Sequence, residues 1–192
     1  MPIRLLTSGG GTTTIQPTTS ASSVTLTVPS VNANVVTTGD TASVTQAMLG
    51  SGLAGTGPAF SAYASVATSL TSGAFTKIAL QTEEYDTASC FDSTTNYRFT
   101  PNVAGYYQFS AAFQVASPKI LVASLFKNGS EYRRCVYTDP NTIYAVGANA
   151  LIYLNGSTDY VELHGYNGTA GAVNTQTGIQ FTWMTGFLAR AA

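Results

Sequence analysis

Charged side chains are scarce in this sequence. They make up 9% of its 192 residues, against about 25% in ordinary soluble domains. Ser, Thr, Asn, Gln and Gly must therefore supply most of the contact with water, a composition more typical of extracellular fibres and virion proteins than of a free cytosolic enzyme. The net charge is −1, with eight basic residues spread along the chain, so no basic patch for nucleic acid or an anionic membrane is present. We expect neither partner.

Cysteine and long apolar runs are also scarce. Cys90 and Cys135 are too few for a disulfide framework and lack the spacing of a zinc site, so we expect two free thiols and no metal centre. The first residues, MPIRLLTSGGG, lack the apolar stretch of a signal peptide, and no run reaches the length of a membrane span. We therefore expect synthesis in a cytoplasm without a signal peptide.

The first 57 residues contain no Phe, Tyr or Trp, and 20 of the first 56 are Ser or Thr. Such a segment buries too little apolar surface to offset its own ordering entropy, about 1 to 2 kcal/mol per residue, so it needs a partner surface. Val24, Leu26 and Val28 alternate with threonines, as in a strand with one apolar face. We interpret residues 1–40 as an extended attachment arm whose apolar contacts are Val24, Leu26, Val28, Val35 and Val36.

A short helix is predicted between this arm and the rest of the chain. Ser43 can cap it and Gly50 supplies a left-handed stop, which leaves the helix at residues 44–49. A Gly-rich joint follows. We therefore divide the chain into an N-terminal arm, residues 1–57, and a head, residues 58–192.

The head reads as a series of short strands. Apolar and polar residues alternate in runs that are separated by turn residues, and no run has a helical period. The Asn-Gly pairs that begin at Asn128, Asn155 and Asn167 mark turns. Each also matches the N-x-S/T acceptor sequence for glycans, and we favour the turn over the glycan. The predicted strands are residues 60–66, 75–81, 97–100, 106–115, 120–127, 132–137, 148–154, 160–166 and 177–189.

Residues 85–110, YDTASCFDSTTNYRFTPNVAGYYQFS, contain a Tyr-Asp pair, an aromatic residue, a proline and then Gly-x-Tyr-x-Phe. This order resembles the complement-q globular head, which is related to tumour necrosis factor, and MTGFLA at residues 184–189 resembles its last strand. The resemblance implies an all-β jelly-roll sandwich that forms a homotrimer. The residues expected in core or trimer packing are Phe99, Tyr107, Phe109 and Phe187.

Two short motifs in the arm point to a different family. TLTVP at residues 25–29 and TTGD at residues 37–40 resemble a leader of bacteriophage virion proteins, especially fibre and decoration proteins. An arm of this kind in front of a complement-q-like head implies a protein of the virion surface, made in the host cytoplasm. The arm would be the attachment and the head the exposed part.

Residues that could carry catalysis do not converge in the sequence. His164, the single histidine, lies in a predicted strand, where a packed or surface residue is expected. Glu83, Glu84, Asp86 and Asp92 are expected in a solvated loop, and a calcium site there stays open as the alternative. The sequence has no nucleophile elbow, zinc motif or phosphate-binding loop. We therefore expect no enzyme and no cofactor.

The hypothesis of function is a trimeric capsid decoration, or cement, protein. Its arms would bind the major capsid protein or another virion protein, because the arm is polar and strand-patterned and no shaft separates it from the head. The alternative is the tip of a tail or head fibre that binds a host receptor or glycan. Its contact loops would be residues 138–142 and 165–174, which include Tyr166, Asn167 and Asn174.

Overall fold

The computed structural model describes residues 3–6, 12–15, 57–117, 119–134 and 144–192. The chain divides into two units, Met1–Ser43 and Val44–Ala192, and each is described by itself. In the first unit, strand β1 (Ile3–Leu6) pairs antiparallel with β2 (Thr12–Ile15). The helix predicted at residues 44–49 and the apolar arm residues Val24, Leu26, Val28, Val35 and Val36 lie outside the described residues.

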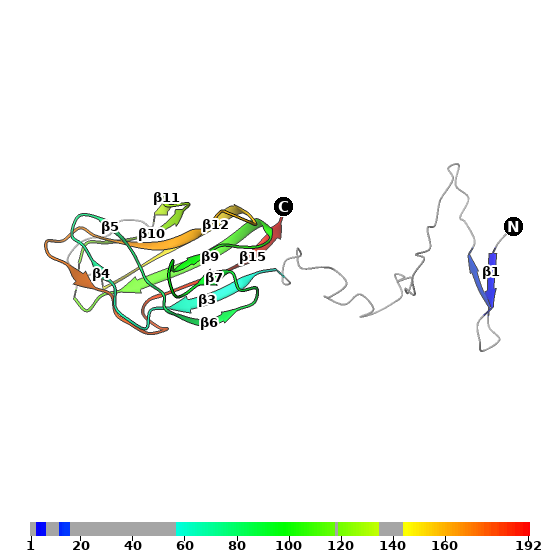
Figure 1. Ribbon diagram of the computed structural model, residues 1–192, viewed down its shortest axis with the longest axis horizontal. Helices are drawn as coiled ribbons and strands as arrows, with labels where there is room; N and C mark the ends of the chain where they lie inside the picture. Colours follow the sequence, from blue (N-terminus) through cyan, green and yellow to red (C-terminus); the bar gives the residue numbers. More distant parts are fainter. Residues whose placement is uncertain (1–2, 7–11, 16–56, 118, 135–143) are drawn as a thin grey trace. The chain divides into compact units, whose positions relative to one another are not determined.

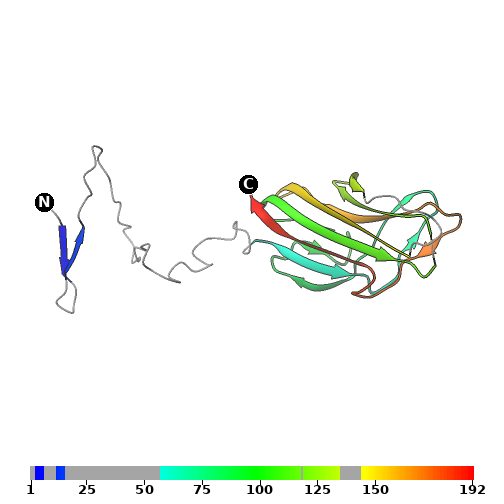
Figure 2. The same ribbon diagram turned by 180° about the vertical axis from the view of Figure 1, so that it is seen from behind.

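The head is a β-sandwich, so the all-β prediction is confirmed (Figure 1). Its first sheet has five strands in the order β12, β9, β15, β3, β6, and every neighbouring pair is antiparallel. Figure 2 shows β15, in red, between the green β9 and the cyan β3. The bounds are β3 Ala59–Tyr63, β6 Thr82–Asp86, β9 Ala104–Gln114, β12 Ala145–Asn155 and β15 Trp183–Ala191.

The second sheet has six strands. Five follow the order β11, β10, β13, β8, β7, and β5 also pairs with β13. A two-stranded ribbon of β4 and β14 lies at the end of the sandwich away from the C-terminus (Figure 1). No helix long and apolar enough to cross a membrane is found in the described ranges. The bounds are β4 Ser69–Leu70, β5 Phe75–Lys77, β7 Phe91–Asp92, β8 Arg98–Phe99, β10 Leu121–Lys127, β11 Ser130–Arg134, β13 Val161–Asn167 and β14 Val173–Asn174.

Aromatic rings form the centre of the core between the sheets. Phe60 stacks on Phe91 and Phe99 with ring centroids 4.8 and 4.6 Å apart. Tyr107 and Phe109, on β9, are completely buried beside them, because alternation along a strand sends every second residue to the same face. Burial of each ring contributes about 1.5 to 3 kcal/mol to stability.

Two contacts of β9 fix its position beside this core. The Tyr107 hydroxyl donates a hydrogen bond to the Val103 carbonyl at 2.7 Å, and burial raises the pKa of this tyrosine well above its usual value. On the same face of the strand, Gly105 packs so closely on β15 that a Cβ there would collide with the carbonyl oxygen of Arg190. A glycine is therefore required where the two strands meet.

The predicted turn at Asn128 and Gly129 is present. Both residues have positive φ, 52° and 77°, as a type I′ turn requires. The turn joins Lys127 of β10 to Ser130 of β11, which are paired. The strand predicted at residues 132–137 is therefore β11, which begins two residues earlier and is described as far as Arg134.

Three strand predictions differ from the structure. The acidic residues 82–86 form strand β6 and not a solvated loop, since an edge strand of a sheet tolerates charge. The strand predicted at 75–81 ends at Lys77, after which Ile78 makes one more backbone hydrogen bond to Leu163 and, like Leu80, is buried. The last predicted strand begins late, because Gly178 adopts a φ of 114° and residues 177–182 form a bend before β15.

Candidate interaction surface

The outer face of the five-stranded sheet is apolar at its centre. Residues on β9, on β12 and on β15 as far as Leu188 alternate between buried and accessible side chains. The accessible set contains large apolar residues that are 40–54% exposed, namely Tyr106, Leu151, Tyr153 and Phe187. We call these four residues, with Gln108 between them, the aromatic face.

The register of the strands brings these side chains together. Gln108 lies opposite Leu151 on one side and Phe187 on the other, and Tyr106 lies opposite Tyr153. The rings of Tyr106 and Tyr153 meet edge to face with their centroids 5.4 Å apart, a favourable aromatic geometry. The aromatic face is therefore one continuous surface that crosses three strands.

Charge is nearly absent from this surface. Strands β9 and β12 contain no charged residue, and Arg190 near the end of β15 is the only one on the three strands. Depletion of charge together with enrichment of aromatic residues is the signature of the buried centre of a protein interface. An exposed apolar patch on a monomer also points to a partner. The aromatic face has the chemistry of a protein contact.

The outer face of the six-stranded sheet has a different chemistry. Lys77 Nζ contacts Glu162 Oε1 at 2.7 Å, and His164 Nε2 lies 3.2 Å from Glu162 Oε2. The His164 ring stacks on Phe126 with centroids 3.8 Å apart. Burial alone would raise the pKa of Glu162, but hydrogen bonds from His164 and Lys77 and their positive charge outweigh it and lower that pKa. We call Lys77, Glu162 and His164 the ionic cluster.

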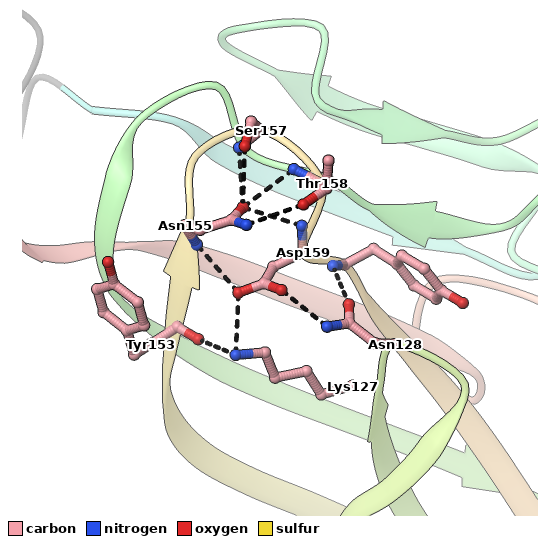
Figure 3. A network of polar contacts seen from close by, with 8 residues as sticks. Lys127, Asn128, Tyr153, Asn155, Ser157, Thr158 and Asp159 are labelled. Carbon is pink, nitrogen blue, oxygen red and sulfur yellow. Dashed lines mark hydrogen bonds and ion pairs between the residues drawn. The ribbon is translucent and has the colours of Figure 1, made fainter.

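A second polar network closes one end of the sandwich (Figure 3). Lys127 Nζ lies 3.0 Å from Asp159 Oδ2 and donates to the Tyr153 carbonyl at 2.8 Å. Asn128 Nδ2 donates to Asp159 Oδ1 at 2.7 Å, and the Asn155 N–H donates to Asp159 Oδ2 at 3.1 Å. The bond from Asn128, opposed by burial and supported by Lys127, lowers the pKa of Asp159. This network fixes the turn after β10 against the loop after β12.

All three asparagines of the N-x-S/T sequences use their side-chain amides inside the fold. Asn128 donates to Asp159, Asn155 donates to Thr158 Oγ1 at 2.8 Å, and Asn167 donates to the Gly171 carbonyl at 2.8 Å. Each amide holds a turn in place. These contacts agree with the interpretation of the three Asn-Gly pairs as turns.

The acidic residues have structural contacts. Asp86 accepts a hydrogen bond from the Phe91 N–H at 2.7 Å, and Asp92, at the end of β7, accepts from backbone N–H groups of the turn that follows it. Glu83 and Glu84 accept from serine hydroxyls. Among the residues with a described position, no group of three or more His, Cys, Asp or Glu could hold a metal ion. The hydrogen bonds give these carboxylates structural roles in the fold.

Cys90 is a free, buried thiol, and burial raises its pKa. A thiol of this kind is a poor nucleophile because the thiolate is the reactive form. Cys135 lies outside the described residues.

The residues predicted from the sequence fall into different places. Phe99, Tyr107 and Phe109 are completely buried in the core of the sandwich, whereas Phe187 belongs to the aromatic face. Tyr106, Leu151 and Tyr153 were not predicted, although their positions could be read from the alternation: each directly precedes or follows a buried core residue on β9 or β12.

The residues predicted to contact a receptor lie mostly in strands and not in exposed loops. Tyr166 and Asn167 lie in strand β13 and not in a loop, since β13 extends to Asn167. Asn167 is completely buried, and the Tyr166 ring packs on Phe75 at 5.4 Å. Only Asn174, in β14, is exposed. Residues 138–142 lie outside the described residues.

No family model and no curated protein sequence matches the chain. Solved structures do match the head. The globular domain of zebrafish complement 1qA protein is 18% identical, with a TM-score of 0.53 over 70% of this chain and 98% of that one. Eiger TNF from S. frugiperda is 12% identical, with a TM-score of 0.52 over 70% and 93% of the two chains. Murine APRIL is 10% identical, with a TM-score of 0.51 over 67% and 96%.

These likenesses define the class of the fold. The head is a jelly-roll β-sandwich of the complement-1q and tumour-necrosis-factor type, as the sequence predicted. At these levels of identity, the likeness concerns the fold alone.

Proposed function

We propose that the chain is a structural protein of a bacteriophage virion, a capsid decoration protein whose head forms a homotrimer. The observation that carries the proposal is the pairing of a jelly-roll head that exposes an uncharged aromatic face with an N-terminal segment that has no aromatic residue. The first region has the surface of a self-associating domain. The second has the composition of an arm that needs a partner.

The aromatic face supports the homotrimer. Tyr106, Leu151, Tyr153 and Phe187 remain 40–54% exposed in a single chain. Burying such side chains against another copy recovers about 25 cal/mol per Å² of apolar surface. Because β9 and β12 carry no charged residue, association buries few ions. A rotational arrangement of three copies covers the face on every one of them.

The arm supports attachment. Its alternation of apolar residues and threonines suits an extended strand that adds to a sheet of the major capsid protein or another virion protein, where main-chain hydrogen bonds supply the affinity. The residues assigned to this contact are Val24, Leu26, Val28, Val35 and Val36. The resemblance of TLTVP and TTGD to phage virion leaders supports the same role.

A fibre tip that binds a host receptor or glycan is the second candidate function. The end of the sandwich that carries β4 and β14 lies away from the C-terminus (Figure 1), and it presents the exposed Asn174. The segments before β4 and after β14 also expose the apolar residues Val66 and Ile179. An exposed end of this kind is where a receptor would bind.

Deletion of residues 1–40 tests the attachment. The shortened chain is expected to keep its oligomeric state, measured by sedimentation equilibrium, and to lose binding to capsids purified without the protein. The full chain carrying Phe187→Glu is the matched variant, because it should lose the trimer and retain the arm. Capsid binding by the shortened chain equal to that of the full chain would rule out the arm as the attachment.

Copy number separates the two candidate functions. Imaging of intact particles is expected to find the head at many equivalent positions on the capsid. Density for the head only at the tail or at the ends of fibres would favour the fibre tip.

A further inference from the structure

Strand β12 has a free edge. It is the first strand in the order of the five-stranded sheet, and its one partner among the described strands is β9. The two strands pair from Ala145 to Asn155 without a register shift. The opposite edge of β12 therefore presents a straight row of backbone groups.

Alternate residues of β12 direct their backbone toward this edge. The Tyr144 carbonyl, just before the strand, accepts from the Val115 N–H at 2.7 Å, on the side of β9. In contrast, the Tyr153 carbonyl accepts from Lys127, and the Asn155 N–H donates to Asp159, both away from β9. In an antiparallel pair, residues alternate along the strand between the two directions. Even-numbered residues of β12 therefore point their N–H and C=O groups toward β9, and the odd-numbered residues Ala145, Gly147, Asn149 and Leu151 point theirs toward the free edge.

These four residues have open backbone groups. No hydrogen bond from any residue in the described ranges reaches their N–H or C=O on the free edge, and Ala145, Asn149 and Leu151 are exposed. The row ends at Tyr153, where Lys127 and Asp159 occupy the edge (Figure 3). The open stretch is therefore residues 145–151, the usual length of a paired strand.

The other sheet edges carry features that block pairing. Strand β6 has two adjacent glutamates and a register shift, β11 has one glutamate, two arginines and a register shift, and β7 has two residues. Proteins use charge, irregularity and short length to keep an edge from pairing with another chain. Strand β12 has no charge, no proline and no register shift. An edge without these features is suited to a partner strand.

We propose that the free edge of β12 pairs antiparallel with β12 of a second copy of the chain, over residues 145–151. The two-fold axis passes through Ala148, so Gly147 of each copy lies opposite Asn149 of the other and Ala145 opposite Leu151. Each large side chain thereby meets a small one, and no like charges face each other. Hydrogen-bonded pairs in such a ladder each exchange two main-chain bonds. The contact uses the backbone edge of β12, whereas the aromatic face uses side chains on the outer face of the sheet, and Leu151 is the one residue that belongs to both. The pairing therefore joins two heads, or two trimers, edge to edge.

Asn149→Pro in the full chain tests this pairing. Proline removes the N–H that points to the free edge and leaves the bonds to β9 intact, and proline is tolerated at such an edge position. Asn149→Ala keeps the N–H and is the matched control. By sedimentation equilibrium, the wild type and Asn149→Ala are expected to have twice the mass of Asn149→Pro. Equal masses for all three, or a mass that Asn149→Ala halves as well, would overturn the proposal.

Hydrogen exchange on the wild-type chain gives a test that does not depend on how a variant folds. The amides of Gly147, Asn149 and Leu151 are expected to exchange slowly at high protein concentration and rapidly on dilution, while those of Ala148 and Ala150 stay protected. Fast exchange of the first three at every concentration would overturn the pairing. Protection that disappears when residues 1–40 are deleted would assign the edge to the N-terminal arm and overturn it too. Capsid binding is measured separately, so either failure leaves the attachment proposal to its own test.

Discussion

The outer faces of the two sheets differ in how far other side chains cover their aromatic rings. On the six-stranded sheet, polar side chains lie over aromatic rings: the His164 ring stacks on Phe126, and the Arg134 guanidinium lies 5.3 Å from the centroid of Phe75. On the five-stranded sheet, Lys127 Nζ lies 5.8 Å from the centroid of the Tyr153 ring, but Phe187 is 51% exposed and Tyr106 is 44% exposed. The large rings of this sheet are thus less covered by polar side chains than Phe75 and Phe126 are. The aromatic face is therefore the surface on which we expect another chain to bind.

Phe187→Glu is expected to have the largest effect on this difference. A charge placed within the aromatic face should weaken self-association by about 2 to 4 kcal/mol, which is about 30- to 1,000-fold in the dissociation constant. Sedimentation equilibrium of the full chain measures it. Val66→Glu is the control, because Val66 is 63% exposed and lies outside the aromatic face. The same weakening by both substitutions would mean that self-association uses another surface.

Lys77→Met is expected to act on stability and not on assembly. It leaves the buried Glu162 carboxylate with His164 as its remaining partner, and the free energy of unfolding should fall by about 1 to 3 kcal/mol. Urea denaturation measures the loss, and Lys77→Arg, which keeps the charge, should restore most of it. A Lys77→Met variant as stable as the wild type would show that the ionic cluster does not stabilise the fold.

Acid is expected to lower the free energy of unfolding through two carboxylates, Asp159 and Glu162. The folded-state pKa values of Asp159 and Glu162 are lowered, so their contribution is present above the unfolded values of about 4 and is lost as pH falls through the folded ones. Urea midpoints between pH 7 and pH 2.5 measure this loss. Asp159→Asn should make the midpoint less dependent on pH. An unchanged dependence in that variant would assign the acid sensitivity to other groups.

Arg134→Ala is expected to have the smallest effect. The Arg134–Glu131 pair is short, 2.6 Å, but its side chains are 55% and 30% exposed. Exposed pairs of this kind contribute about 0 to 1 kcal/mol, so the free energy of unfolding should change by less than the Lys77→Met loss. A larger change than that would mean that the contact of Arg134 with Phe75 matters more than the ion pair.

The sequence predicts the fold where strand alternation and turn chemistry agree. On β9, Tyr107 and Phe109 alternate with polar residues, and the predicted strand matches the observed one within two residues. The pair Asn128 and Gly129 is enough to predict its turn, because few other residue pairs adopt positive φ at both positions. Strand β6 was missed because its acidic residues carry no apolar alternation, and its pairing depends on β3, some twenty residues earlier in the chain.

The candidate surface could be predicted only in part. Alternation shows which residues of β9 and β12 face outward, but not that β15 lies beside β9 and brings Phe187 next to Gln108. Such neighbours are set by the order of strands in the sheet. The same holds for Asn167, which begins an Asn-Gly pair and so looks like the start of a turn, until the pairing of Leu121 with Asn167 extends β13 to include it.

The position of β15 also bears on when the head can fold. Strand β3 opens the sandwich, yet its sheet neighbour toward β9 is β15, and the Thr185 hydroxyl donates to the Phe60 carbonyl across a separation of 125 residues. During synthesis, β3 and β9 leave the ribosome before β15, the strand that lies between them in the finished sheet. Contacts of such long range make folding slow and leave unpaired strand edges exposed until they form. The head is thus expected to complete its five-stranded sheet only once residues 183–191 have emerged.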